Sequence, residues 1–163
     1  MEIRNATLAD QSAILDIINY HIEHTTAIFD FDKRDIETQN SIFKTKTKKG
    51  FPTLVATLNN EIVGFASYDV FRNKAGFNPT LEQSIYIKPE YTGKGIGIVL
   101  LQKLIATAKQ NKLKNLVAVI DGSNTKSIAF HKKAGYEIIG TMPQSAFKFN
   151  TWLDTVFLQL QLY

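Results

Sequence analysis

A glycine-rich turn is the segment of this sequence whose residue types best suit ligand binding. Gly93, Gly95 and Gly97 alternate with Lys94 and Ile96 between an expected strand and an expected helix. Glycines let the backbone approach a ligand closely, and the first N–H groups of a helix have no intrahelical acceptor. These groups and the helix dipole favour a phosphate or diphosphate, to which Lys94 would add a positive charge. The alternative is a tight turn that is glycine-rich without binding anything.

The spacing of these glycines excludes two common phosphate-binding motifs. A dinucleotide-binding fold needs G-x-G-x-x-G early in a βαβ unit, followed by an acidic residue about 20 positions later. Here the pattern is G-x-G-x-G, and several expected strands precede it. The P-loop pattern G-x-x-x-x-G-K-[ST] is absent. The class of ligand must therefore be inferred from the rest of the chain.

Apolar spacing predicts the elements that would position the turn. An apolar stripe over residues 14–22 predicts a helix, and Thr7 with Asp10 predicts a capping box before it. Further helices are expected at 35–43, through 100–108 and at 126–134. Strands are expected at 3–6, 53–58, 62–68, 82–88, 116–120, 136–140 and 152–163. This order is typical of a mixed α/β fold, here a single domain spanning residues 1–163.

Composition restricts the function classes further. Of the 163 residues, 44% are hydrophobic and 21% are charged, as in an ordinary globular protein. The chain has no cysteine, which excludes disulfides, thiolate metal sites and a cysteine nucleophile. The first residues lack the apolar core of a signal peptide, and no apolar run approaches the roughly 18 residues of a membrane span. We therefore expect a cytoplasmic protein without a membrane partner.

The net charge of +4 has three interpretations. The first is an enzyme whose surface lysines are solvated. The densest basic stretch, residues 44–49, precedes Gly50 and Pro52, where a loop is expected. The second and more specific interpretation is a nucleic-acid-binding surface, but no group of aromatic residues near this stretch could stack on bases. Attraction of an anionic cofactor is the third. We expect no nucleic-acid partner.

Two segments resemble the GNAT superfamily of acetyltransferases. Residues 92–97 resemble its motif [QR]-x-x-G-x-[GA], although Thr92 stands where glutamine or arginine is usual. Residues 124–136 resemble its second coenzyme-A segment, N-x-x-[SA]-x-x-[FL]-[YH]-x-x-x-G-[FY]. The resemblance implies a mostly antiparallel, twisted sheet of six to seven strands flanked by helices, with acetyl-CoA held where two strands splay apart. It implies no metal.

Four further stretches narrow the resemblance, which covers nearly the whole chain. Residues 25–30, 50–52, 82–89 and 148–154 are similar to phosphinothricin and methionine-sulfoximine acetyltransferases. Members of that branch acetylate the α-amine of glutamate-like or methionine-like compounds. The resemblance also implies a homodimer, with the segment around Trp152 near a dimer contact and the substrate pocket.

The resemblance assigns the cofactor-binding residues. The backbone of the 85–87 strand would bind the pantetheine arm and stabilise the carbonyl oxygen of the thioester, and the turn would bind the diphosphate. The complete set is Ile85, Tyr86, Ile87, Gly93, Lys94, Gly95, Ile96, Gly97, Ile98, Asn124 and Ser127.

The catalytic residues implied by the resemblance are Glu82 and His131. Glu82 would be the base that deprotonates the amine, since a carboxylate near an apolar strand has a raised pKa. His131 would protonate the departing thiolate, or would simply be a half-buried helix residue. Arg72 would bind a substrate carboxylate, because its planar fork matches that group, or would simply be an arginine of a surface loop. Phe29 and Phe77 would form the walls of an apolar slot.

Other functions remain open from the sequence alone. A protein N-terminal or lysine acetyltransferase would use the same cofactor on a different acceptor. A non-catalytic coenzyme-A-binding module would lack a base, and Glu82 argues against it. A basic nucleic-acid-binding domain would bind DNA in a strongly salt-dependent way. The sequence does not identify the acceptor amine.

Overall fold

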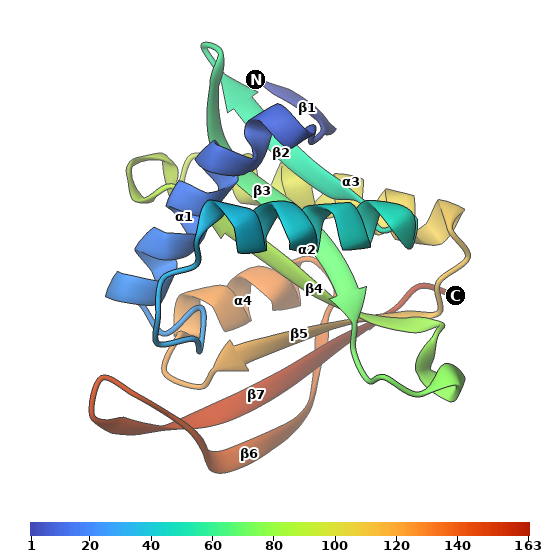
Figure 1. Ribbon diagram of the computed structural model, residues 1–163. Coiled ribbons are helices and arrows are strands. Elements are labelled where there is room, and N and C mark those ends of the chain that lie inside the picture. Colours follow the sequence, from blue (N-terminus) through green and yellow to red (C-terminus); the bar gives the residue numbers. More distant parts are fainter.

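The computed structural model describes all 163 residues and consists of one seven-stranded sheet with helices on both faces (Figure 1). Neighbouring strands are antiparallel except for one parallel pair, β4 with β5. This architecture confirms the predicted fold class. The strands, in their order across the sheet, are β1 (Glu2–Asn5), β2 (Thr53–Leu58), β3 (Glu61–Val70), β4 (Thr80–Ile87), β5 (Asn115–Asp121), β7 (Thr151–Gln161) and β6 (Glu137–Lys148).

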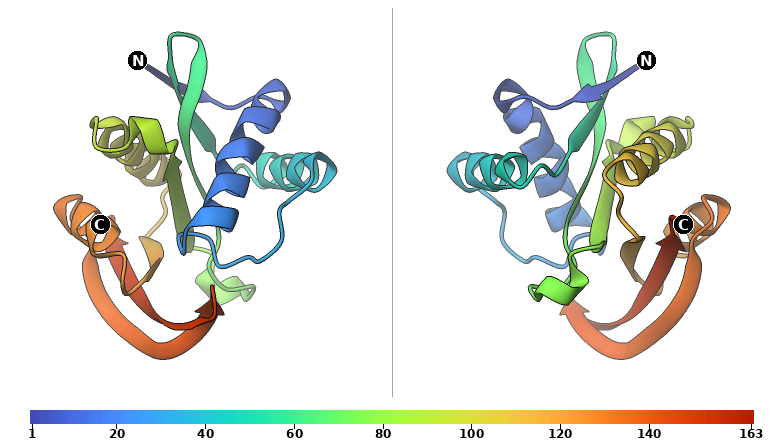
Figure 2. Two further views of the ribbon diagram at one scale, coloured as in Figure 1. Left: turned by 90° about the vertical axis from the view of Figure 1, so that its left-hand side faces the viewer. Right: turned by 90° about the vertical axis from the view of Figure 1, so that its right-hand side faces the viewer.

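The four helices divide between the two faces of the sheet (Figure 2). α1 (Gln11–His24) and α2 (Ile36–Lys48) cover one face, and α3 (Ile96–Gln110) and α4 (Thr125–Lys133) cover the other. Each face has its own group of buried apolar residues, the larger one beneath α3. Three short 3₁₀ helices complete the elements: η1 (Leu8–Asp10), η2 (Ala75–Phe77) and η3 (Pro89–Tyr91). No helix combines the length and the apolar character needed to cross a membrane.

The predicted capping box before α1 is confirmed, and it lies at the start of the short helix η1. The Thr7 N–H donates to the Asp10 carboxylate over 2.6 Å, and the Thr7 hydroxyl donates to it over 2.9 Å. Both terminal nitrogens of the Arg4 guanidinium donate to the same carboxylate over 2.8 Å. Asp10 therefore joins β1 to the start of α1.

α2 differs from its predicted extent. The helix continues to Lys48 rather than ending near Phe43, and the loop expected at Gly50 and Pro52 follows it. Gly50 ends it with a φ of 73°, and the Phe51 N–H donates to the Lys46 carbonyl over 2.9 Å, as in a Schellman motif. Alternating Lys and Thr residues show no apolar periodicity, so the last turns of this helix were not predicted. The side chain of Lys46 nevertheless turns toward the sheet.

The β6–β7 hairpin is longer than predicted on the β6 side. The expected strand over 136–140 begins at Glu137 and runs to Lys148, while Tyr136 is buried just before it. Its register shifts twice, between Ile138 and Gly140 and between Met142 and Ala146. These irregularities, and exposure of both of its faces, removed the alternation of apolar and polar residues that identifies a strand.

The parallel pairing of β4 with β5 is short. It runs from Thr80 opposite Asn115 to Glu82 opposite Val117 and then stops. Beyond this point β4 stays paired with β3 as far as Ile87, and β5 stays paired with β7 as far as Asp121. The two strands therefore diverge, which opens the sheet in its middle.

Candidate active site

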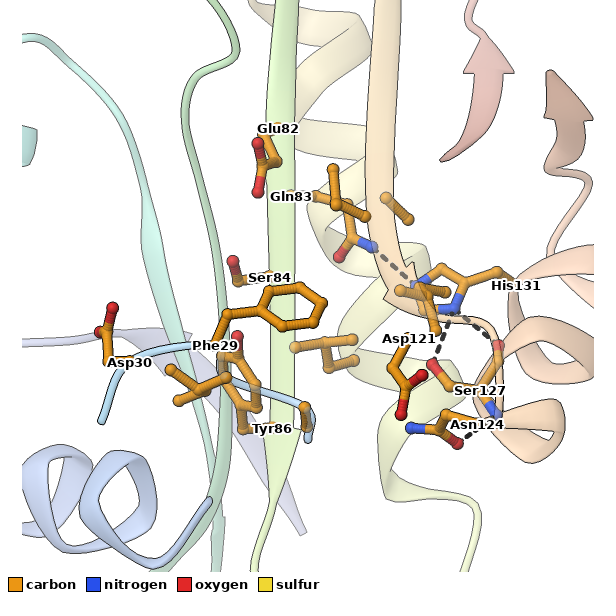
Figure 3. Close-up of a pocket in the computed structure, with 16 residues that line it drawn as sticks. Phe29, Asp30, Glu82, Gln83, Ser84, Tyr86, Asp121, Asn124, Ser127 and His131 are labelled. Atoms are coloured by element: carbon orange, nitrogen blue, oxygen red, sulfur yellow. Dashed lines mark hydrogen bonds between the residues drawn. The ribbon is translucent and has the colours of Figure 1, made fainter. Parts of the chain in front are cut away.

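The gap between β4 and β5 forms a cavity of about 250 Å³ (Figure 3). Both diverging strands line it, together with the segment that follows α1 and one side of α4. The lining residues are Ala27, Ile28, Phe29, Asp30, Glu82, Gln83, Ser84, Ile85, Tyr86, Ala118, Val119, Ile120, Asp121, Asn124, Ser127 and His131.

Alternation along β4 separates the chemical groups of this cavity. In Figure 3 the side chains of Glu82, Ser84 and Tyr86 lie on one side of the strand, and Gln83 lies on the other, toward His131. Tyr86 packs against Phe65 on the α1 side. A ligand that passes through the gap would therefore meet a carboxylate on one side and an amide–imidazole pair on the other.

Glu82 has the electrostatic environment of a base. Burial raises the pKa of its carboxyl group, and the neighbouring Asp69 carboxylate raises it further, while Lys46 lowers it. Asp121, which also lines the cavity, behaves differently. Burial raises its pKa, but hydrogen bonds from Ser123 and Thr26 outweigh this effect and lower the pKa overall. Glu82 is thus the carboxylate better suited to accept a proton.

Backbone donors of β4 face the gap. The Lys88 N–H donates to the Val63 carbonyl, so Lys88 faces β3 in an antiparallel ladder without irregularity. Residues alternate in such a ladder, so the N–H groups of Ile85 and Ile87 point away from β3 and toward the space that β5 has left. Tyr86 directs its own N–H into the β3–β4 ladder. The predicted carbonyl-oxygen site therefore has two donors, Ile85 and Ile87.

His131 is held at both ring nitrogens. Its Nδ1 lies 2.8 Å from the Ser127 carbonyl oxygen, which can only accept, so Nδ1 carries the proton. Its Nε2 lies 2.7 Å from the side-chain nitrogen of Gln83, which donates to it. Burial lowers the pKa of this imidazole, which favours the neutral form. The Gln83 carbonyl oxygen is buried in the cavity lining without a hydrogen-bond partner.

The glycine turn has the geometry expected of a diphosphate site. None of the six backbone N–H groups from Gly93 to Ile98 has a hydrogen-bond acceptor within the chain. Gly93 and Gly95 have φ of 79° and 80°, and a Cβ at either position would point into open space. Such consecutive free amides before a helix form a concave anion site. Gly97 lies against Ile87 and Phe130, which places the turn beside the gap.

Asn124 orders the segment opposite the turn. It is the N-cap of α4, and its side-chain oxygen accepts from the Ser127 N–H over 3.1 Å. Asn124 and Ser127 both line the cavity, so the predicted cofactor residues of α4 and of β4 meet there.

Comparison with known proteins is consistent with this geometry. The model of the acetyltransferase (GNAT) family matches residues 17–136. The chain belongs to the GNAT acetyltransferase family. It is 42% identical to the L-methionine sulfoximine/L-methionine sulfone acetyltransferase of Pseudomonas aeruginosa, over 98% of this chain and 94% of that protein.

Two solved GNAT structures illustrate the range of relatives. A phosphinothricin acetyltransferase from Sinorhizobium meliloti in complex with AcCoA has a TM-score of 0.96 and 33% identity, over 98% of this chain and 87% of that one. A ribosomal-protein-alanine N-acetyltransferase from Brucella melitensis has a TM-score of 0.97 and 40% identity, over 99% of both chains. The predicted family, branch and enzyme class are confirmed.

The GNAT fold brings together most of the predicted site residues, but not all of them. Phe29 lines the cavity with the β4 and α4 residues. Arg72 and Phe77 lie outside it, on the exposed β3–β4 connection, where the Arg72 guanidinium stacks over the Phe77 ring at 5.2 Å. Their predicted roles in substrate binding stay predictions.

Sequence reasoning missed Gln83 and Asp121. Gln83 follows the proposed base directly, and Asp121 ends a buried strand at the start of the α4 segment. The only signal that could have identified them was their position beside residues already assigned to the site. No group of three or more histidine or acidic side chains is arranged to hold a metal ion.

Proposed function

We propose that this chain is a cytoplasmic N-acetyltransferase that transfers the acetyl group of acetyl-CoA to the α-amine of an amino-acid analogue. Methionine sulfone, methionine sulfoximine and phosphinothricin are the acceptors that the names of its relatives suggest. The observation that carries the proposal is the gap between β4 and β5. It presents a carboxylate, two free backbone donors and, at its end, a row of free amides on the α3 turn.

The turn and α4 would hold the cofactor. The amides from Gly93 to Ile98 would bind its diphosphate, with Lys94 adding charge, and Asn124 and Ser127 would contact the arm that enters the gap. The bound group supplies an acetyl thioester, whose carbonyl carbon is open to attack by an amine. The N–H groups of Ile85 and Ile87 would donate to the carbonyl oxygen as it gains negative charge.

Glu82 would prepare the acceptor. Its carboxylate takes a proton from the ammonium group, directly or through one water, and leaves a neutral amine whose lone pair attacks the acetyl carbon. A C–N bond forms and the C–S bond breaks, so the electron pair of that bond leaves on sulfur. The attacking nitrogen gives its second proton to the departing sulfur, directly or through water, which leaves the N-acetyl product and a free thiol, and Glu82 returns the first proton to solvent. Direct transfer needs both substrates in the gap together, which the divergence of β4 from β5 allows.

The hydrogen bonds of His131 support a positioning role in this reaction. In its neutral form Nδ1–H donates to Ser127 and Nε2 accepts from Gln83, so no N–H is left for the departing sulfur. The sequence left two interpretations of His131 open, and these contacts favour the one without proton transfer. His131 then fixes the orientation of Gln83 at the cavity wall.

A small acceptor fits the enclosure of the site better than a polypeptide does. The connection from Thr25 to Asp30 lies over the cavity. The Lys148 ammonium holds it by donating to the carbonyl oxygens of Thr25 and Ile28, over 2.7 and 2.5 Å. Protein N-terminal acetylation is the second candidate function, because the Brucella relative carries that name.

The exposed apolar surface of β6 and β7 supports a homodimer. Six large apolar side chains are exposed on this hairpin: Ile138, Ile139, Met142, Phe147, Phe149 and Trp152. Exposed apolar side chains gathered on one hairpin are typical of an interface between subunits. Light scattering at micromolar concentration should give the mass of two chains. The double variant Ile139→Glu with Trp152→Glu should give the mass of one.

A thiol-release assay tests the proposed function. The wild-type protein with acetyl-CoA should release thiol with methionine sulfone, methionine sulfoximine or phosphinothricin. It should release little with peptides that begin with alanine. The opposite preference would favour the protein-acetylating function, and no release with any amine would overturn both.

A further inference from the structure

The opening between β4 and β5 is closed at one end, and two residues mark that end. The last pair of the parallel ladder is Glu82 with Val117, so Gln83 and Ala118 are the first residues beyond it on the two strands. Residues at the same level of paired strands direct their side chains to the same face of the sheet. Gln83 and Ala118 therefore lie side by side where the strands begin to separate, on the face that α3 and α4 cover.

The proposed diphosphate site lies at the other end of the opening. The glycine turn follows the carboxyl end of β4, and a Cβ on Gly97 would lie 3.8 Å from the Ile87 side chain. A carrier held at the turn therefore enters the opening beside Ile87 and extends along β4 toward Gln83. The acyl group is the last group of that carrier. Each methylene added to it extends the carrier further toward the closed end.

A hydrogen-bonded pair of side chains crosses the closed end. The side-chain nitrogen of Gln83 donates to Nε2 of His131 over 2.7 Å, and Nδ1 of His131 donates to the Ser127 carbonyl oxygen over 2.8 Å. Gln83 and His131 both line the cavity, and they are only 5% and 3% exposed. Because α4 follows β5, this pair links β4 to the opposite side of the opening.

The pair has no room to move away from the opening. The buried ring of Tyr136 packs edge-on against the His131 imidazole, with the ring centroids 5.2 Å apart, and the Phe130 ring does so at 5.0 Å. An acyl chain that displaced the pair would break the hydrogen bond between Gln83 and His131. A buried donor and a buried acceptor would then lose their partners, which is unfavourable.

The carbonyl oxygen of the Gln83 side chain opposes a long acyl chain in a second way. This oxygen is buried in the cavity lining and has no hydrogen-bond partner within the chain. Methylene groups do not donate hydrogen bonds, so an acyl chain packed against the oxygen would bury it unpaired. The volume and the polarity of Gln83 therefore both disfavour acyl groups longer than acetyl.

We propose that Gln83, held in place by His131, limits the length of the acyl group that the enzyme transfers. This inference rests on the proposed function and specifies its acyl donor, a thioester of a short acyl group. Ala118 leaves space for the acetyl methyl group, because its own side chain is a single methyl group. Gln83 occupies the space beyond. An enzyme pocket distinguishes substrates that differ by one methylene by roughly tenfold to two-hundredfold.

Two acyl donors of different length test the proposal. Thiol release with methionine sulfone as the acceptor gives kcat/KM for acetyl-CoA and for butyryl-CoA, whose acyl group is two methylenes longer. We expect the wild-type protein to prefer acetyl-CoA by roughly tenfold or more. Gln83→Ala removes the amide group and opens the closed end. The ratio of kcat/KM for butyryl-CoA to kcat/KM for acetyl-CoA should therefore rise by roughly tenfold or more.

A rise in this ratio separates a specific role from damage to the fold, because partial unfolding lowers the activity with both donors. Gln102→Ala changes an exposed glutamine of α3 and should leave the ratio at its wild-type value. Gln83→Ser also shortens the side chain, and it should raise the ratio even if Gln83→Ala does not fold.

Two results would overturn the inference alone. One is equal use of the two donors by the wild-type protein, and the other is an unchanged ratio in folded Gln83→Ala or Gln83→Ser. Failure of the wild-type protein to acylate any amine from either donor overturns the proposed function, and the inference with it.

Discussion

The side-chain nitrogen of Gln83 on β4 and Nε2 of His131 on α4 lie 2.7 Å apart, across the opening of the sheet. This contact links the two elements that line the cofactor side of the cavity. It occupies the imidazole nitrogen that a proton donor would need. We therefore propose that the chemistry of the site depends on Glu82 and on backbone donors more than on His131.

A conservative replacement of His131 should have a small effect. We expect His131→Gln to lower kcat less than tenfold and to leave the shape of the pH profile of kcat unchanged, because the side chain positions Gln83 and transfers no proton. General acid catalysis contributes about 10²–10⁴-fold. A fall of that size in kcat, with loss of the alkaline limb of the profile, would show that His131 protonates the leaving sulfur.

The acid limb of the pH profile should report Glu82. Burial, followed by the charge of Asp69, raises the pKa of this carboxyl group, so activity should fall with decreasing pH at values above the ordinary glutamate pKa. Removing the Asp69 charge lowers the pKa and keeps the base ionised at lower pH. We therefore expect Asp69→Asn to move the acid limb of kcat/KM to lower pH. Asp16→Asn, an exposed change on α1, should not move it, and a shift of the limb to higher pH in Asp69→Asn would contradict this assignment.

The left-handed conformation of Gly95 should be needed for cofactor binding. Its φ of 80° costs about 1–2 kcal/mol for any other residue, so Gly95→Ala displaces the free amides of the turn. We expect calorimetry to give a Kd for acetyl-CoA about 5-fold to 30-fold higher. Gly76→Ala is the matched control, because that glycine has open space around its Cβ position and no positive φ. An equal effect of both changes would exclude a specific role for the turn.

The Asp10 carboxylate should stabilise the fold at neutral pH. It is buried and accepts from Arg4 and Thr7, and these hydrogen bonds, with that of Arg4 the strongest, lower its pKa. Asp10→Asn leaves the Arg4 charge unpaired, and we expect it to reduce the free energy of unfolding by about 1–3 kcal/mol at pH 7.

The pH dependence of this contribution has a defined sign. A carboxyl group with a lowered native pKa stabilises the native state fully above its unfolded pKa of about 3.9. The difference in unfolding free energy between wild type and Asp10→Asn should therefore be constant at neutral pH. It should shrink as the pH falls below about 4 toward the native pKa. Urea titrations at several pH values measure it, and a difference that grows on acidification would be inconsistent with this assignment.

Local signals in the sequence were sufficient to locate the turn and the helix N-cap that we propose bind the cofactor. The glycine turn and the N-cap at Asn124 are short motifs whose chemistry depends on neighbouring residues. The structure has both where they were predicted, at the N-termini of α3 and α4.

The acceptor half depends on contacts between distant segments, which spacing does not reveal. The gap arises because β4 and β5 pair over three residues each and then separate, and the sequence carries no sign of where that pairing ends. Lys46 lies within a run of exposed lysines, so its burial against Ser67 could not be read from residue type. Arg72 has the right chemistry for a carboxylate but does not line the cavity, and its role stays a prediction.

We propose that Glu82, at the opening between β4 and β5, accepts the proton of the attacking amine. The most direct test of this claim is kcat/KM for methionine sulfone at pH 7.5 in Glu82→Gln, compared with Glu90→Gln, which changes an exposed carboxylate beyond the same strand. We expect a loss of about 10²–10⁴-fold in Glu82→Gln, with the KM for acetyl-CoA unchanged, and no loss in Glu90→Gln. Wild-type activity in a folded Glu82→Gln variant would contradict the claim.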